Sequence, residues 1–320
     1  MKKSLGAAGL LACGIVFAAP LAVDVLPETG PLRATTMQRL LLVDAERLGN
    51  RIVAVGDRGY IVFSDDGGVT WKRAKAPPAP LLTSIDFLDG QAGLAVGHDA
   101  VILKTTDAGE TWTQQFSAPA EQRALLDVNF LTGGHAIAVG AYAAYYESRD
   151  GGKTWNARKI TNDDKHFNAI LELGERRLLI LGEAGTILAS DDDGATWKPV
   201  ASPYKGSLFG GVIAGDGAVI AFGMRGRIYR SVDKGATWKQ VDNPSVAALM
   251  GGEKMADGTL VIAGAAGTVL VSRDNGLSFQ PLDSGSTKAY AKALLGAANT
   301  VVLLGEAGVR TAPMPQQAKR

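Results

Sequence analysis

Six aspartates occur in one short motif that repeats along the chain, which makes them the first candidates for chemistry. The motif reads Ser/Thr-x-Asp-x-Gly-x-Thr-Trp, and its last copy is degenerate. Acidic residues among glycines could form a calcium loop or supply acid/base catalysts. However, the spacing and closing glutamate of an EF-hand are absent, and six copies at identical positions indicate a scaffold. The aspartates are Asp66, Asp107, Asp150, Asp192, Asp233 and Asp274, followed by Trp71, Trp112, Trp155, Trp197, Trp238 and Phe279.

The residue types of the motif fit a tight turn that precedes a buried aromatic ring. An aspartate side chain accepts hydrogen bonds from backbone N–H groups of its own turn, and glycine permits a positive φ. The aromatic ring is expected to pack between neighbouring strands. We therefore predict a structural motif, with no catalytic residue, no metal site and no cofactor.

Other catalytic and binding signatures are absent from the sequence. There is no Gly-x-Ser-x-Gly elbow, P-loop or His-Glu-x-x-His motif, and His98, His135 and His166 are the only histidines. A net charge of +1 argues against a nucleic-acid partner. The single cysteine, Cys13, allows neither an intrachain disulfide nor a cysteine-based zinc or redox site.

The motif belongs to a longer repeat. Its aromatic residues recur every 41 to 43 residues, and a glycine after an apolar run lies 15 residues before each of them. In the second unit, short apolar or β-branched segments at 83–87, 93–96, 101–105 and 111–116 predict four strands. Four strands in about 41 residues are typical of a β-propeller blade. The glycines are Gly56, Gly97, Gly140, Gly182, Gly223, Gly264 and, without a following aromatic residue, Gly305.

These seven units predict an all-β protein, a seven-bladed β-propeller over residues 23–312 with a tail at 313–320. The last unit is truncated, with strands expected around 291–296, 301–305 and 309–312. Residues 26–36 precede the first complete unit, so we expect them to supply the missing outer strand of the last blade. Pairing the two termini in this way would remove exposed edges.

The N-terminus has the pattern of a secretory signal peptide at residues 1–22. Lys2 and Lys3 precede an apolar run from Leu5 to Val23 that ends among small residues. Two alternatives stay open: a lipoprotein acylated at Cys13, and an uncleaved membrane anchor. In each case we expect an exported protein, periplasmic or membrane-associated on the extracytoplasmic side.

The repeated motif resembles the Asp-box, or bacterial neuraminidase repeat. The complete unit, with Gly-x-x-Gly turns such as 56–59, 182–185, 223–226 and 305–308, is similar to the photosystem II stability and assembly factor family over roughly residues 36–312. The resemblance implies a propeller without catalysis that binds a membrane protein or an envelope complex and assists its assembly. We expect no cofactor and no nucleic-acid partner, and we expect a monomer.

Any binding site is expected on the face that carries the Gly-x-x-Gly turns and the links between blades. The alternative function is a sialidase-like or other glycan-active or glycan-binding propeller, with Tyr142, Tyr145 and Tyr146 near one turn. Sialidases use a tyrosine nucleophile, but the Arg-Ile-Pro segment of that family is missing here. The candidate partner-binding residues are Asp57, Arg58, His98, Asp99, Tyr142, Glu183, Arg225, Arg227 and Glu306.

Overall fold

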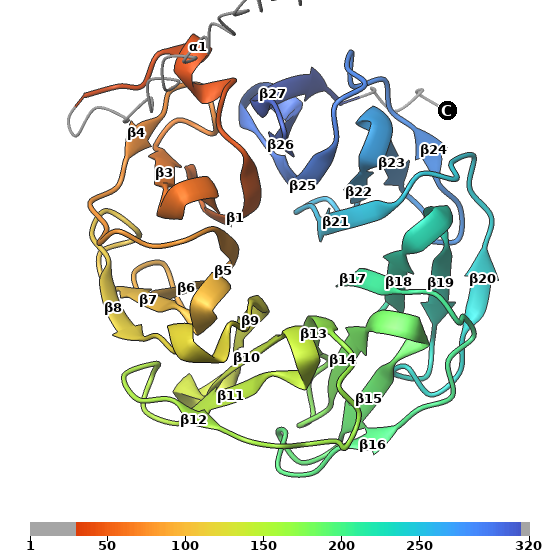
Figure 1. Ribbon diagram of the computed structural model, residues 1–320. Helices are drawn as coiled ribbons and strands as arrows, with labels where there is room; N and C mark the ends of the chain where they lie inside the picture. Colours follow the sequence, from red (N-terminus) through yellow and green to blue (C-terminus); the bar gives the residue numbers. More distant parts are fainter. Residues whose placement is uncertain (1–29, 315–320) are drawn as a thin grey trace, which may run out of the picture.

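The computed structural model describes residues 30–314 of the chain. Seven antiparallel sheets are arranged in a ring around a central channel (Figure 1). Six sheets have four strands each and the last has three. The predicted seven-bladed β-propeller is therefore confirmed.

Each blade uses its strands in chain order, from the channel outward. In the second blade the strands differ from the predicted ones by at most two residues at either end. The first three blades comprise β1 (Leu42–Leu48), β2 (Arg51–Gly56), β3 (Ile61–Ser64) and β4 (Lys72–Arg73); β5 (Leu82–Phe87), β6 (Gly93–Gly97), β7 (Ile102–Thr105) and β8 (Thr113–Phe116); and β9 (Leu125–Phe130), β10 (Ala136–Gly140), β11 (Tyr145–Ser148) and β12 (Asn156–Ala157). The next three comprise β13 (Phe167–Glu172), β14 (Leu178–Gly182), β15 (Ile187–Ser190) and β16 (Lys198–Pro199); β17 (Leu208–Ile213), β18 (Val219–Gly223), β19 (Ile228–Ser231) and β20 (Lys239–Val241); and β21 (Leu249–Lys254), β22 (Leu260–Gly264), β23 (Val269–Ser272) and β24 (Gln280–Pro281). The last blade has β25 (Tyr290–Leu295), β26 (Thr300–Gly305) and β27 (Gly308–Pro313).

The ring has two distinct faces because each blade is a meander. One face carries the interblade links and the turns between second and third strands, and we call it the link face. The opposite face carries the turns between first and second strands and the Asp-boxes, and we call it the Asp-box face. In six blades the link-face turn is a short 3-10 helix: η1 (Asp57–Gly59), η2 (His98–Ala100), η5 (Ala141–Ala143), η6 (Glu183–Gly185), η7 (Met224–Gly226) and η8 (Ala265–Gly267). Three further 3-10 turns are η3 (Pro119–Glu121), η4 (Thr132–Gly134) and η9 (Ala297–Asn299).

The glycine that ends each second strand is required by a close backbone approach. A Cβ at Gly56 would lie 2.0 Å from the carbonyl oxygen of Leu41, in the preceding link. The next residue, Asp57, donates its N–H to that same oxygen at 2.9 Å. Equivalent bonds recur in all seven blades, so the backbone at this glycine holds the residue before each first strand against the end of the second strand.

The apolar core lies between adjacent blades. Trp112 is buried with Val53 and Phe63 of the first blade and with Ala74 beside β4. Trp71 and Trp155 are buried in the same way, whereas Trp197 and Trp238 are only partly buried. Each aromatic ring therefore joins its blade to the preceding one, as the repeat predicts.

The N-terminal segment closes the ring differently from the prediction. Residues 26–29 lie outside the described residues, but Pro31 bridges Lys72 of β4, and Leu32 donates its N–H to the carbonyl of Trp71 at 2.7 Å. The segment thus pairs with the first blade and does not supply a fourth strand to the last sheet among the described residues. The reason is packing, because Leu32 enters the apolar cluster around Trp71.

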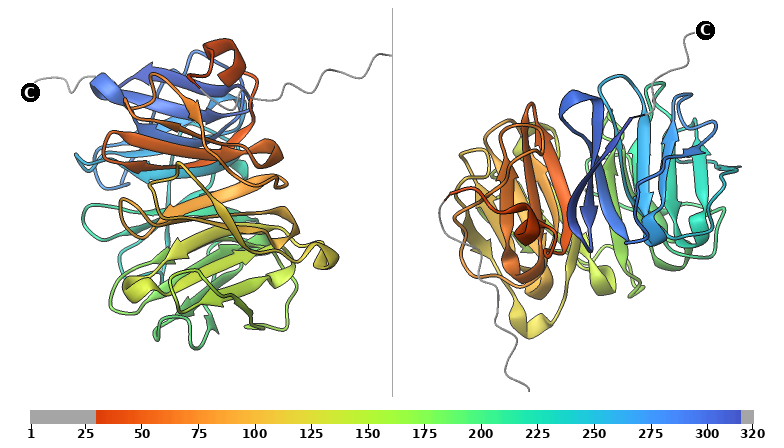
Figure 2. Two further views of the ribbon diagram at one scale, coloured as in Figure 1. Left: turned by 90° about the vertical axis from the view of Figure 1, so that its left-hand side faces the viewer. Right: turned by 90° about the horizontal axis from the view of Figure 1, so that it is seen from above.

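The helix α1 (Ala34–Met37) then takes the position of an interblade link beside the last blade (Figures 1 and 2). A Cβ at Gly308 would lie 1.6 Å from the carbonyl oxygen of Met37. Gly267 approaches Ser286 of its link in the same manner. The inner strands β25 and β1 are in contact, which completes the ring.

Candidate functional site

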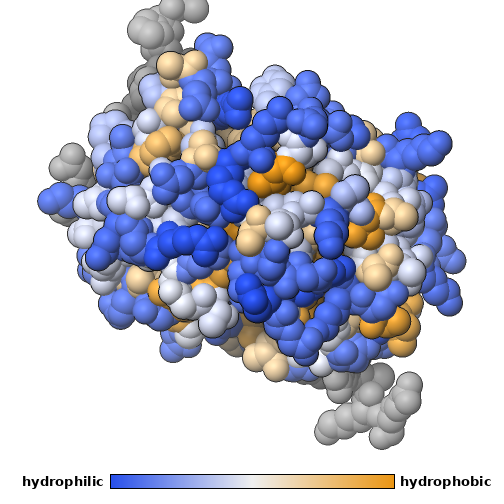
Figure 3. Space-filling view, turned by 90° about the horizontal axis from the view of Figure 1, so that it is seen from below, coloured by the Kyte–Doolittle hydropathy of each residue, from blue (hydrophilic) through white to orange (hydrophobic). Residues whose placement is uncertain are grey.

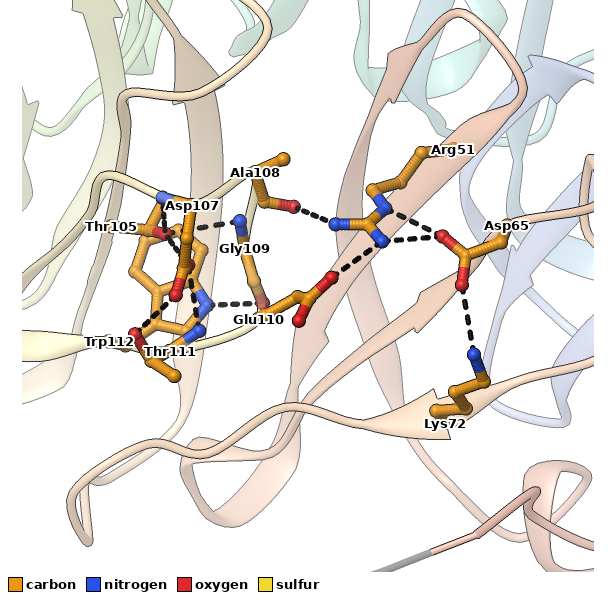
Figure 4. Close-up of polar contacts among 10 residues, drawn as sticks. All are labelled: Arg51, Asp65, Lys72, Thr105, Asp107, Ala108, Gly109, Glu110, Thr111 and Trp112. Atoms are coloured by element: carbon orange, nitrogen blue, oxygen red, sulfur yellow. Dashed lines mark hydrogen bonds and ion pairs between the residues drawn. The ribbon is translucent and has the colours of Figure 1, made fainter.

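The Asp-box is a self-contained hydrogen-bonded turn (Figure 4). In the second blade, Asp107 accepts the Thr111 N–H at 2.9 Å and the Thr111 hydroxyl at 2.5 Å. Thr105 donates its hydroxyl to Asp107 and accepts the N–H of Gly109. The indole N–H of Trp112 then donates to the carbonyl of Gly109 at 2.9 Å. Every polar group of this aspartate is thus used inside its own turn.

The same arrangement lowers the pKa of the Asp-box carboxyls. Burial opposes the change at Asp66, but hydrogen bonds from Thr70 and Ser64 lower its pKa to about 2. Hydrogen bonds from the following threonine lower the pKa of Asp192 and Asp233 to about 2 as well. These carboxylates stay ionised and are hydrogen-bonded within their own turns.

Basic side chains join several Asp-boxes to the preceding blade. Arg51 of β2 donates to the carbonyl of Ala108 at 3.2 Å and contacts Glu110 at 2.9 Å and Asp65 at 2.6 Å (Figure 4). Lys104 likewise donates to the carbonyl of Gly151 at 2.6 Å. The Asp-box face is therefore occupied by contacts between blades.

All nine predicted binding residues lie on the link face, in or next to the turns after the second strands. The structure does not gather them into one cluster. Arg58 faces its neighbour Asp57 at 3.3 Å, and Glu306 accepts the N–H of Ala289 at 3.4 Å. His98 and Asp99 form part of a separate turn, η2.

Tyr142 and Glu183 are brought together by His166, from the polar link between the third and fourth blades. The His166 ring lies edge-on to the Tyr142 ring at 5.0 Å, and its Nδ1 accepts the N–H of Tyr142 at 3.0 Å. Glu183 accepts the backbone N–H of His166 at 3.1 Å. Tyr142 is exposed, whereas Tyr145 and Tyr146 are buried between blades and unavailable as surface nucleophiles.

A group of cations is exposed on the link face near the fifth blade. Arg225 lies in η7, Arg227 directly follows it, and Lys205 lies in the link that precedes β17. Within residues 30–314 none of the three forms an ion pair. The exposed apolar side chains of Met224 and Val246 belong to the same region, since Gly226 packs on the backbone of Val246. Lys205 and Val246 were not identified from the sequence, because nothing in their links distinguishes them.

The channel contains a polar network that the sequence did not reveal. Lys292 of β25 contacts Asp44 of β1 at 3.1 Å, and Ser84 of β5 donates to Asp127 of β9 at 2.8 Å. Ser84 also lies 3.2 Å from Asp44, so the chain of contacts crosses four blades. Asp127 also accepts the N–H of Ile170 in β13, so the network includes a fifth blade. Aligning the units on their glycines would have shown these residues 12 or 13 positions before each glycine.

Three more carboxyls lie deeper in the channel, toward the Asp-box face. Burial raises the pKa of Asp86 to about 8 and that of Glu253 to about 7. Burial also raises the pKa of Glu46, and it raises that of Asp127 to about 6. Burial alone would lower the pKa of Lys292, but the carboxylates of Asp44, Glu46 and Glu253 raise it above its usual value. Burial thus raises the pKa of Asp86, Glu253, Glu46 and Asp127, while the nearby carboxylates raise that of Lys292.

A pocket of about 470 Å³ opens at the link-face mouth of the channel. Its walls include Leu41, Leu126, Phe209 and Met250, and its floor includes the Asp44–Lys292 pair. Seen from below, the outer rim of the ring is mostly hydrophilic, and its apolar residues form separate spots (Figure 3). The link face around this mouth is the best candidate site.

Within residues 30–314, no group of three or more histidine, cysteine, aspartate or glutamate side chains could hold a metal ion. No helix among the described residues is long and apolar enough to cross a membrane.

Comparisons with known proteins agree with this fold. None of the curated proteins compared matches the sequence. A structure described as "YCF48 bound to D1 peptide" is 21% identical, with a TM-score of 0.69, and covers 87% of this chain and 95% of that one. The structure of YCF48 from Cyanidioschyzon merolae is 18% identical, with a TM-score of 0.63, and covers 85% of this chain and 95% of that one.

A glycosidase has a similar architecture. The GH74 xyloglucanase from Xanthomonas campestris is 13% identical, with a TM-score of 0.64, and covers 86% of this chain but 52% of that one. At such identities the likenesses show the fold alone.

The family model described as photosynthesis system II assembly factor YCF48, however, matches residues 44–117 and 114–262, more than half of the sequence. This chain belongs to the family of that assembly factor.

Proposed function

We propose that this protein is a non-enzymatic scaffold that binds a membrane-protein partner through its link face and assists the assembly or stability of an envelope complex. A relative from the same family is described as bound to a D1 peptide. An extended peptide needs a broad, largely preformed surface, which the rigid ring provides. No photosystem is implied for the organism, because a shared fold does not determine the partner.

The observation that carries the proposal is a set of cations that form no ion pair within residues 30–314, beside exposed Met224 and Val246: Lys205, Arg225 and Arg227. Exposed cations without an acidic partner favour a ligand with carboxylates, and arginine can bind carboxylates through two parallel hydrogen bonds. Exposed apolar side chains add contact area. Acidic, partly apolar peptide segments combine both features.

The test is affinity capture from solubilised membranes with a charge-reversed protein, Lys205→Glu/Arg225→Glu/Arg227→Glu. We expect loss of a specific membrane complex that the parent retains. The matched control reverses three exposed lysines away from the link face, Lys153→Glu/Lys198→Glu/Lys239→Glu, and is expected to retain it. Equal capture by both variants would contradict the proposal.

We also propose that the protein acts after export, because residues 1–22 have the signal pattern described above. N-terminal sequencing of the mature protein tests this directly. A start at residue 19, 20 or 23 fits a cleaved signal, and a blocked Cys13 fits a lipoprotein. An intact Met1 on a cytosolic protein would refute export.

The absence of catalysis is part of the same proposal. Tyr142 contacts His166 and lies on the same face as Glu183, but no arginine contacts either side chain among the described residues. Purified protein is expected not to hydrolyse a sialoside or xyloglucan. Turnover that disappears in Tyr142→Phe or Glu183→Gln would establish a glycan-active enzyme instead.

A further inference from the structure

The channel mouth has an apolar pocket that the scaffold proposal alone does not explain. Leu41 and Met250, which are 38% and 40% exposed, both line this pocket. Leu126 and Phe209 continue the wall inward. A volume of about 470 Å³ falls in the range of small-ligand pockets.

The charged groups of the floor do not require a charged ligand. Lys292 and Asp44 are paired at 3.1 Å and their side chains are only 18% and 16% exposed. Asp127 accepts bonds from Ser84, Val128 and Ile170. Because these polar groups already have partners, the surface that a ligand can still gain from is the apolar wall.

The pocket is directly connected to the unpaired cations. The N–H of Met224 in η7 donates to the carbonyl of Ser207 at 3.0 Å, two residues before Phe209. The link that contains Val246 packs against Gly226 of the same turn and continues to Met250 in β21. An occupant of the pocket would therefore have Arg225 and Arg227 to one side of it.

We propose that this pocket binds one bulky apolar side chain, aromatic or leucine, of an extended partner segment whose neighbouring residues are acidic. The inference rests on the proposed function and specifies which side chain of the partner the pocket would bind. The apolar side chain would remove Leu41, Met250 and Phe209 from water, while the flanking carboxylates would contact the cations of the fifth blade. An anchoring side chain in a central pocket is how many protein interfaces concentrate their affinity.

The test uses two synthetic pentapeptides with blocked ends. One has phenylalanine between two pairs of glutamates, and the other has alanine in its place. With the full propeller, the phenylalanine peptide is expected to bind at least about tenfold more tightly in a titration followed by calorimetry or chemical shifts.

Two variants locate the binding. Ala291→Trp places a large side chain in the pocket, and Leu41→Ser/Met250→Ser removes its apolar rim. Both are expected to abolish the difference between the peptides. The matched control, Leu88→Ser/Leu277→Ser, changes exposed leucines on the Asp-box face and is expected to preserve it. Circular dichroism and the melting temperature check that each variant folds.

The outcomes separate this inference from the scaffold proposal. Equal binding of the two peptides, or no binding of either, would overturn the pocket. So would a preference for phenylalanine that persists in both pocket variants. If capture of a membrane complex is lost in the charge-reversed triple variant but unchanged in the pocket variants, the scaffold stands and the pocket does not.

Discussion

Two sets of carboxyls, at the Asp-boxes and in the channel, share one chain but have opposite environments. Hydrogen bonds from the same turn lower the pKa of Asp66 to about 2, although its burial acts in the other direction. Burial near other acids raises the pKa of Asp86 in the channel to about 8. The first set is formed by residues within a single turn, whereas the second exists only once the ring has closed. The comparison separates local stabilisation of a blade from stabilisation of the ring.

The largest expected effect is a pH dependence that differs between the two sets. Channel carboxyls have raised pKa values in the folded protein, so their stabilisation is complete below pH 4 and is lost as the pH rises through about 6 to 8. Asp-box carboxyls have lowered values, so their stabilisation is present above pH 4 and is lost as the pH falls toward 2. We expect the free energy of unfolding to decrease between pH 5 and pH 9.

Urea denaturation at a series of pH values measures this profile. Asp86→Asn is expected to flatten the decrease on the alkaline side, and Asp66→Asn to flatten the acid side only. A stability that rises steadily from pH 5 to pH 9 would contradict the arrangement of the channel.

Removal of Lys292 is expected to be the most harmful single substitution of a charged residue. Lys292→Met leaves Asp44 without its ion pair beside Glu46 and Glu253. Breaking a buried pair in this way destabilises by about 3–5 kcal/mol. Unfolding at pH 8 tests the value, and the loss is expected to shrink at pH 5, where the neighbouring carboxyls take up protons. Lys72→Met is the control, because its pair with Asp65 is exposed and is expected to contribute about 0–1 kcal/mol.

A substitution in an Asp-box is expected to cost less stability than Lys292→Met and to leave the channel network intact. Asp107→Ala removes the acceptor for the Thr111 N–H and hydroxyl. Because Thr111 is exposed and water can replace the carboxylate, we expect a loss of about 0.5–1.5 kcal/mol for each hydrogen bond. Chemical denaturation measures the loss, and a double variant with Lys292→Met is expected to be additive because the two sites share no partner. A clear departure from additivity would show that the box and the channel are coupled.

The difference between the two regions also explains what could be predicted from sequence. The Asp-box was predictable because Asp107, Gly109 and Trp112 lie within a few residues and the pattern repeats. The blades followed from the same repeat. The channel network was not found, since Asp44, Ser84 and Asp127 come from separate blades and differ in residue type. Only their common position relative to the repeated glycines could have indicated it.

The ring closure shows a second limit of the repeat. The last unit ends before an outer strand, which suggested a strand from residues 26–36 in that place. Instead, this segment packs against the first blade. The buried cluster around Trp71 includes Leu32, Met37 and Leu40, and Pro31 forms a β-bridge with Lys72. A repeat predicts how blades resemble one another, but not how an unrelated segment packs where the repeat is interrupted.

The smallest expected effect is at the contact between the first two blades. Arg51 joins Asp65 and Glu110, whose side chains are 41% and 54% exposed. Such ion pairs contribute about 0–1 kcal/mol, and Arg51 also donates to the carbonyl of Ala108 at 3.2 Å. Arg51→Met is therefore expected to lower the free energy of unfolding by about 1 kcal/mol or less, and 1 M salt is expected to mask most of that loss. A loss of free energy of unfolding as large as that of Lys292→Met would contradict this expectation. Solvent-exposed ion pairs on the Asp-box face would then stabilise the ring as strongly as the enclosed ion pair of the channel.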